Sequence, residues 1–218
     1  VVQTLTFHRG SYLIDATFDV ANAGSAPVAP YAYFQLTRDT KQAVPQNSMA
    51  PAAYVGPVVY NATDHFKKVE PSEIDKLAAD PTRKVPYAKN TTDGWVGMIE
   101  HYFVSAWLPS DEKKLAREFY TRKLDGGLYA AGVIVPMDAA APGASTRVTV
   151  PLFVGPQDQD LLKKVATGLD LSVDYGIFTV IAAPLFWLLK WLHGLIGNWG
   201  WAIVAMTIMI KGAFYPLN

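Results

Sequence analysis

Lys211 has the most unusual setting in this sequence of 218 residues, because it is the only charged residue between Trp199 and Leu217. A charge near the centre of a lipid-embedded helix costs about 2.5–3.5 kcal/mol on insertion scales. Two interpretations stay open: Lys211 faces a wet cavity inside a larger helical bundle, or its long side chain reaches the nearer membrane surface. Thr207 lies one helical turn earlier and adds a polar group to the same face.

The sequence lacks the usual constellations of catalytic residues. There is no cysteine, which excludes disulfides, thiol catalysis and Cys-ligated metals. No Gly-x-Ser-x-Gly elbow and no Gly-x-x-x-x-Gly-Lys loop occurs. Glu100 and His101 are neighbours in an apparent strand, so they point to opposite faces and cannot easily act together. We therefore predict no enzymatic activity, no cofactor and no metal. The four histidines show no metal-ligand spacing: His8, His65, His101 and His193.

The charged residues divide the chain into two parts. Residues 1–170 carry 18 acidic and 17 basic side chains, whereas residues 171–218 carry only Asp174, Lys190 and Lys211. The whole chain is neutral, which gives no support to a nucleic-acid-binding face. The first part is typical of a water-soluble domain, and the second is typical of a segment that meets lipid.

The water-soluble part is predicted to be mainly β. In Tyr12–Val20 apolar side chains alternate with polar ones, which indicates a strand with one buried and one wet face in an antiparallel sheet. Short helices are expected at Pro71–Ala79, with Ser72 as a candidate N-cap, and at Pro156–Thr167. Asp111–Lys123 is interpreted as a charged loop followed by a strand. The other predicted strands are Val2–Phe7, Tyr54–Tyr60, Trp95–Trp107 and Leu128–Val135.

The apolar part is predicted to begin with a helix that lies in the membrane interface. Ile177–Ile196 is strongly apolar, and Pro184 suits the first turn of a helix. Trp187 and Trp191 would lie at headgroup depth, with Lys190 reaching water. The alternative is a buried core helix.

A transmembrane helix is predicted to follow the break at Gly197. Trp199–Leu217 supplies 19 residues, which span roughly 28 Å, close to the hydrocarbon thickness of about 30 Å. Trp199 and Trp201 at one end and Tyr215 at the other suit an aromatic belt at the membrane interfaces.

Four blocks near the end of the chain resemble the YidC/Oxa family of membrane protein insertases in order and spacing. They are Leu169-Asp-Leu-Ser-Val-Asp-Tyr-Gly, Pro184-Leu-Phe-Trp-Leu-Leu-Lys-Trp-Leu-His, Gly197-Asn-Trp-Gly-Trp and Lys211-Gly-Ala-Phe-Tyr-Pro-Leu. Upstream, stretches such as Phe7-His-Arg-Gly-Ser-Tyr, Gly94-Trp-Val-Gly-Met and Leu152-Phe-Val-Gly-Pro are similar to the large periplasmic domain of that family.

The resemblance implies a periplasmic β-supersandwich with short helices over residues 1–168. A linker and amphipathic interfacial helix would occupy residues 169–198, and the second transmembrane helix of the family residues 199–218. It also implies a fragment, with one transmembrane helix expected before Val1 and further ones after Asn218. The full-length protein would be a multi-pass protein of the bacterial inner membrane, with residues 1–170 in the periplasm.

The resemblance implies a membrane insertase and chaperone for nascent inner-membrane proteins. The family acts alone or with the Sec translocon, including SecYEG and SecDF, in contact with the lipid bilayer. A positive residue, usually Arg, lies in its hydrophilic groove, and Lys211 falls at that position with Thr207 as a neighbour. Lysine keeps the charge and loses the forked donor geometry of arginine.

Two rival functions stay open at the level of sequence. One is a membrane-tethered module whose sandwich binds a sugar or a peptide, which predicts a pocket lined by Trp and acidic side chains. The other is a mutarotase-like enzyme, which requires a carboxylate and a histidine in one cleft. Glu100 and His101 are the first candidates for that pair.

Overall fold

The computed structural model describes residues 1–39, 54–80, 82–111, 114–173 and 179–215. The chain divides into two compact units, Val1–Val173 and Asp174–Asn218. The first unit therefore extends five residues beyond the boundary predicted at residue 168. The added residues include Leu169, which is fully buried in the core of the first unit.

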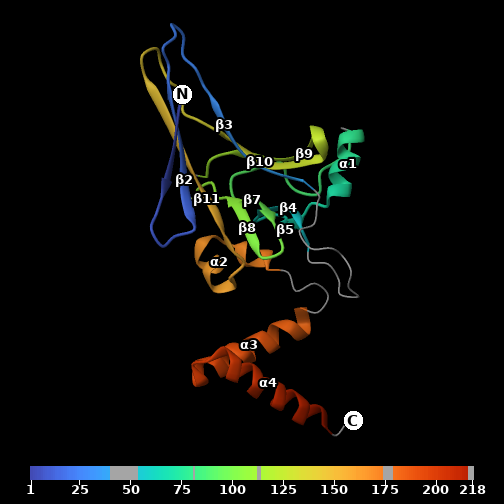
Figure 1. Cartoon of the computed structure of the whole chain (residues 1–218). Helices are drawn as coiled ribbons and strands as arrows, with labels where there is room; N and C mark the ends of the chain where they lie inside the picture. Colours follow the sequence, from blue (N-terminus) through green and yellow to red (C-terminus); the bar gives the residue numbers. More distant parts are fainter. Residues whose placement is uncertain (40–53, 81, 112–113, 174–178, 216–218) are drawn as a thin grey trace. The chain divides into compact units, whose positions relative to one another are not determined.

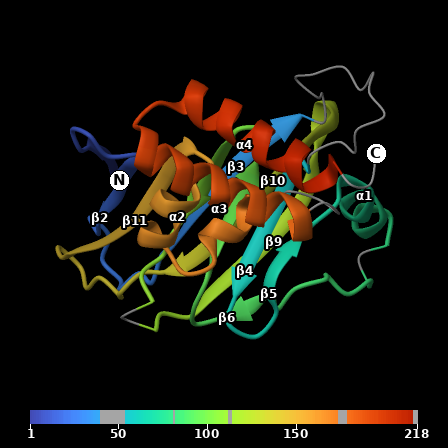
Figure 2. The same cartoon turned by 90° about the horizontal axis from the view of Figure 1, so that it is seen from below.

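The first unit contains two antiparallel β-sheets (Figure 1). The seven-stranded sheet has the order β1-β2-β11-β8-β7-β4-β5, and the four-stranded sheet has the order β3-β10-β9-β6. β4 and β5 are neighbours at one end of the larger sheet (Figure 2). The strands are β1 (Val2–Phe7), β2 (Leu13–Ala21), β3 (Tyr31–Asp39), β4 (Gly56–Asn61), β5 (His65–Lys68), β6 (Asn90–Thr91), β7 (Trp95–Ile99), β8 (Phe103–Trp107), β9 (Arg117–Leu124), β10 (Leu128–Pro136) and β11 (Ser145–Pro156).

The main core lies between the two sheets, as the alternation in β2 predicts. Ala16 of β2 is fully buried there, and Phe18 and Val20 pack against the same cluster. The ring of Phe34 in β3 packs against that of Trp107 in β8, with centroids 5.0 Å apart. The mainly β sandwich expected from the sequence is confirmed.

A second core lies on the outer face of the larger sheet. The short helix α2 (Gln159–Val165) and the 3-10 turn η2 (Leu169–Ser172) contribute Leu162 and Leu169, both fully buried. They pack with apolar residues of the central strands, among them Val58, Val104 and Phe153. All five residues of β7 are buried, because its two faces contribute to the two different cores.

Three local predictions differ from the structure. Trp95–Trp107 is a hairpin of β7 and β8 rather than one strand, with Glu100 and His101 in the turn. α1 (Pro71–Ala79) has the predicted bounds, but its N-cap is Glu70, which makes no side-chain capping bond. α2 begins later than predicted because the Asp158 carboxylate accepts hydrogen bonds from the backbone N–H groups of Asp160 and Leu161.

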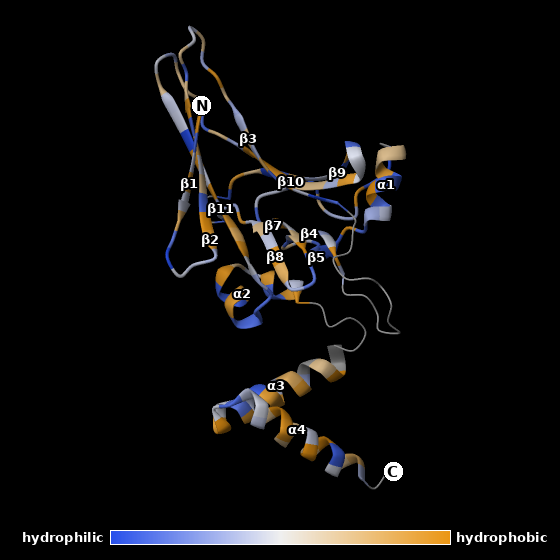
Figure 3. Ribbon diagram, viewed as in Figure 1, coloured by the Kyte–Doolittle hydropathy of each residue, from blue (hydrophilic) through white to orange (hydrophobic). Residues whose placement is uncertain are grey.

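The second unit is a pair of apolar helices, α3 (Thr179–Ile196) and α4 (Trp199–Phe214) (Figure 3). Gly197, with φ +71°, ends α3, and the Asn198 side chain caps α4 by accepting bonds from Gly200 and Trp201. The rings of His193 and Trp199 stack across this turn with centroids 3.9 Å apart. Pro184 lies inside α3 rather than in its first turn, because the helix begins five residues earlier than predicted.

Of the transmembrane helix predicted over residues 199–218, residues 199–215 are described, and residues 216–218 lie outside the described part of the chain. α4 has 16 residues, a rise of about 24 Å, and ends at Phe214. Among the helices of the described residues, none is both long enough and apolar enough to cross a membrane.

Candidate functional site

Lys211 lies in the last turn of α4, and its side chain is exposed. A cation in this position is favoured by the partial negative charge at the C-terminal end of the helix. Thr207, four residues earlier, is also exposed, and its hydroxyl donates a 2.8 Å hydrogen bond to the Ile203 carbonyl. The two side chains therefore share one helix face.

The aromatic residues predicted to meet the membrane interface are exposed on the two helices. Trp187 and Trp191 of α3 are 68% and 51% exposed. The ammonium group of Lys190 lies 5.1 Å from the centroid of the Phe186 ring, a cation–π contact that leaves the lysine half-buried. Trp199, Trp201 and Tyr215 are likewise exposed. The helix pair thus presents a large apolar surface with two cations, Lys190 and Lys211.

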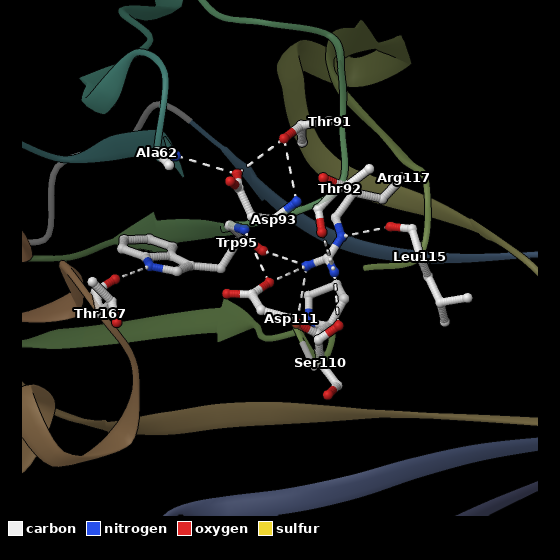
Figure 4. Close-up of polar contacts among 12 residues, drawn as sticks. Ala62, Thr91, Thr92, Asp93, Trp95, Ser110, Asp111, Leu115, Arg117 and Thr167 are labelled. Atoms are coloured by element: carbon white, nitrogen blue, oxygen red, sulfur yellow. Dashed lines mark hydrogen bonds and ion pairs between the residues drawn. The ribbon is translucent and has the colours of Figure 1, made fainter. Parts of the chain in front are cut away.

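A buried arginine that was not predicted from the sequence, Arg117, lies in the middle of a network of polar contacts in the first unit, the polar centre (Figure 4). The side chain of Arg117 has no exposed surface and makes a 2.9 Å ion pair with Asp111. Its guanidinium also donates to five backbone carbonyl groups, those of Thr92, Gly94, Pro109, Ser110 and Leu115. Burial lowers the pKa of Arg117, and the Asp111 carboxylate opposes that shift.

The arrangement around Arg117 holds loops together and offers no reacting group. The indole N–H of nearby Trp95 donates to the Thr167 carbonyl at 3.0 Å, which ties the segment after α2 to β7. Asp93 accepts bonds from Ala62 and Thr91 and so joins two further turns. The polar groups of this centre are engaged with other parts of the same domain, so we assign it a structural role.

Glu100 and His101, the first candidates for the pair required by a mutarotase-like enzyme, do not meet in a cleft. Glu100 lies 3.7 Å from Arg38, and the His101 ring packs edge-on against Tyr102. His8 lies 2.9 Å from Asp15, but the two side chains are 50% and 37% exposed, so that pair lies at the surface. No group of three potential metal ligands occurs among residues 1–39, 54–80, 82–111, 114–173 and 179–215.

One cleft of about 530 Å³ opens between the sheets, next to β2 and β3. Trp107 lines it and is 8% exposed, and its indole N–H has no hydrogen-bond partner within the described part of the chain. The lining contains the side-chain amides of Gln3 and Gln35 but no acidic side chain of a described residue. A sugar- or peptide-binding module was expected to have a pocket lined by both Trp and acidic residues. This cleft has the Trp, but no described acidic residue lines it.

Comparisons with known proteins agree with the fold. The family model of the YidC periplasmic domain matches residues 1–188. Proteins named membrane protein insertase YidC from Aromatoleum aromaticum and Nitrosospira multiformis are each 48% identical over 218 residues, and that from Dechloromonas aromatica is 49% identical over 219 residues. Each alignment covers all of this chain but only 37–38% of the relative, so the chain spans little more than a third of their length. Taken together, the two antiparallel sheets and these matches show that the chain belongs to the YidC family of membrane protein insertases.

Proposed function

We propose that this chain is part of a membrane insertase that inserts and folds nascent inner-membrane proteins. The names of relatives 44–49% identical to the whole chain carry the proposal. We place the longer protein in the bacterial inner membrane, with residues 1–170 in the periplasm. In this proposal it acts alone or beside the Sec translocon.

The helix pair is proposed to meet lipid. α3 would lie in the interface, where Trp187 and Trp191 suit the headgroup region and the Lys190 stem suits apolar surroundings. The exposure of both indoles supports this placement, because a soluble domain rarely leaves such large apolar surfaces uncovered. Trp199 and Trp201 at one end of α4 and Tyr215 at the other would contact the headgroup region.

Lys211 is proposed to supply the positive charge of a hydrophilic groove to which α4 contributes one wall. A polar flank of a nascent protein meets a high barrier in lipid, since each unsatisfied polar group costs several kcal/mol there. An exposed ammonium group lowers that barrier for acidic flanks through a charge-assisted contact. Thr207 would line the same face of the helix.

Lys211→Ala in the full-length protein is expected to reduce insertion of substrates with acidic periplasmic tails about tenfold. A charge-assisted hydrogen bond contributes about 1.5–3 kcal/mol, and 1.4 kcal/mol corresponds to a factor of ten. The measurement is protease protection of nascent substrates in inverted membrane vesicles. Lys211→Arg should insert them normally, because it keeps the charge.

Lys190→Ala is the matched control, because it removes the other cation of the helix pair outside the proposed groove. We expect it to leave the insertion of these substrates nearly unchanged. Equal losses for the two alanine variants, or full insertion by Lys211→Ala, would contradict a specific role for Lys211.

A second candidate function, a membrane-tethered binding module, rests on the cleft beside Trp107. A buried indole N–H without an acceptor is costly, and the nitrogen of Trp107 has almost no exposed surface in the free protein. A ligand that opens the cleft next to it would satisfy this N–H with a carbonyl or a hydroxyl group. Trp107→Phe should then weaken the binding of a sugar or an uncharged peptide about tenfold in fluorescence titrations of the full-length protein. Unchanged affinity, or no binding by the wild type, would rule out the candidate.

A further inference from the structure

A second cleft of about 520 Å³ lies where α1, the segment 82–89 and β9 meet. Its described lining combines three cations, three hydroxyl groups and two aliphatic side chains, and it contains no carboxylate. The cations all come from the segment between α1 and β6, whereas two of the hydroxyl groups come from β9. The lining residues are Leu77, Arg83, Lys84, Val85, Tyr87, Lys89, Tyr120 and Thr121.

Two of the three cations are available to a ligand. Arg83 and Lys84 are exposed, and neither head group forms an ion pair or a side-chain hydrogen bond with a described residue. The charge of Arg83 helps to lower the pKa of nearby Asp80, which therefore offsets part of that charge. Lys89 is 2.9 Å from Glu118, so its charge is partly compensated. The cleft therefore carries an excess of positive charge in a chain whose net charge is zero.

The surroundings hold the walls of the cleft in place. Tyr87 is 5% exposed, and its hydroxyl lies 3.1 Å from the Thr121 hydroxyl, which fixes the segment 82–89 against β9. Asp75 of α1 forms a 2.8 Å ion pair with Lys123 of β9 and accepts a hydrogen bond from Tyr129. These two contacts hold the pKa of Asp75 below its ordinary value, so the carboxylate keeps its charge, and anchors α1, to a lower pH than a free aspartate would.

We propose that this cleft binds a phosphate group. The planar guanidinium of Arg83 can donate two parallel hydrogen bonds to phosphate oxygens, and Lys84 adds a point charge beside it. Leu77, Val85 and the Tyr120 ring would contact the organic part of the ligand. A phospholipid headgroup and a soluble phosphorylated compound share this chemistry. The site is independent of Lys211 and of insertion.

The test uses the full-length protein in neutral detergent and isothermal titration calorimetry. The probes are glycerol 3-phosphate, as the soluble phosphate, and short-chain phosphatidylglycerol below its micelle concentration, as the lipid. We expect binding that weakens with added salt. If the ligand is a phospholipid, phosphatidylglycerol should bind about tenfold more tightly than glycerol 3-phosphate. Similar affinities for the two probes would identify a soluble phosphorylated compound as the ligand.

Arg83→Gln combined with Lys84→Gln is expected to weaken binding at least about tenfold, since each charge-assisted contact exceeds that factor. Lys163→Gln combined with Lys164→Gln removes the same charge from exposed positions of α2 and should leave the affinity unchanged. Circular dichroism checks that both variants are folded. Equal affinities of the two double variants, absence of binding by the wild type, or equally tight binding of an acidic peptide without phosphate would overturn the proposal.

Discussion

Gly94→Ala is expected to destabilise the first unit by about 2–4 kcal/mol. Gly94 has φ +87°, a conformation that costs other residues about 1 kcal/mol or more. An added Cβ would also overlap the Tyr60 carbonyl oxygen and the Asn61 backbone, which cannot move without disturbing β4. Overpacking of this kind typically costs a further 1–3 kcal/mol, roughly. Urea denaturation of the wild type and the variant measures the difference.

Gly143→Ala separates the conformational cost of Gly94→Ala from the cost of overlap with neighbouring atoms. Gly143 has φ +76°, and nothing lies within 4 Å of the position that a Cβ would occupy there. This variant should therefore lose only the conformational part, about 1 kcal/mol. Similar losses at both positions would show that crowding against Tyr60 contributes little.

Arg117→Met is expected to lower the free energy of unfolding by about 3–5 kcal/mol. A buried polar group left without its partner costs about 1–3 kcal/mol, and the carbonyl groups of Gly94 and Pro109 are two such groups. Methionine fills a similar volume but leaves five carbonyl groups without their donor, and the loops around Thr92 and Ser110 lose their common anchor. Thermal and urea denaturation should both show the loss. Hydrogen exchange should rise first in the segment 92–95, because Gly94 accepts directly from the guanidinium.

Arg147→Met provides the control for removal of an arginine. Arg147 is paired with Asp19, but its side chain is 71% exposed, so solvent screens the pair and its loss should cost less than about 1 kcal/mol. A cost for Arg117→Met as small as that for Arg147→Met would contradict the role assigned to the buried guanidinium.

The sandwich was predictable because its strands carry their burial pattern in the sequence. In β2, Ala16, Phe18 and Val20 alternate with polar residues, and they face the main core as expected. The hairpin of β7 and β8 was missed because its turn, near Glu100 and His101, contains neither glycine nor proline. Both strands are apolar on either side of it, so the stretch resembled one long strand.

The polar centre was not predictable for a different reason. Arg117 stands at the start of a strand, where an arginine normally points to solvent. Its partners lie in loops that the sequence separates from it by up to 25 residues, and backbone carbonyl groups leave no signature in residue type. The start of α3 was misplaced because Pro184 is tolerated inside this helix rather than in its first turn.

The pairing of β2 with β11 has a consequence for the order in which the domain can fold. Asp15 lies opposite Pro151, so the β2–β11 ladder of the larger sheet joins residues 136 positions apart. At synthesis rates of about 5–20 residues per second, the ribosome makes the paired residues of β11 roughly 7–27 s after those of β2. During that interval its apolar face is open to wrong pairings, so we infer that biogenesis of this domain is slow and benefits from a holding chaperone.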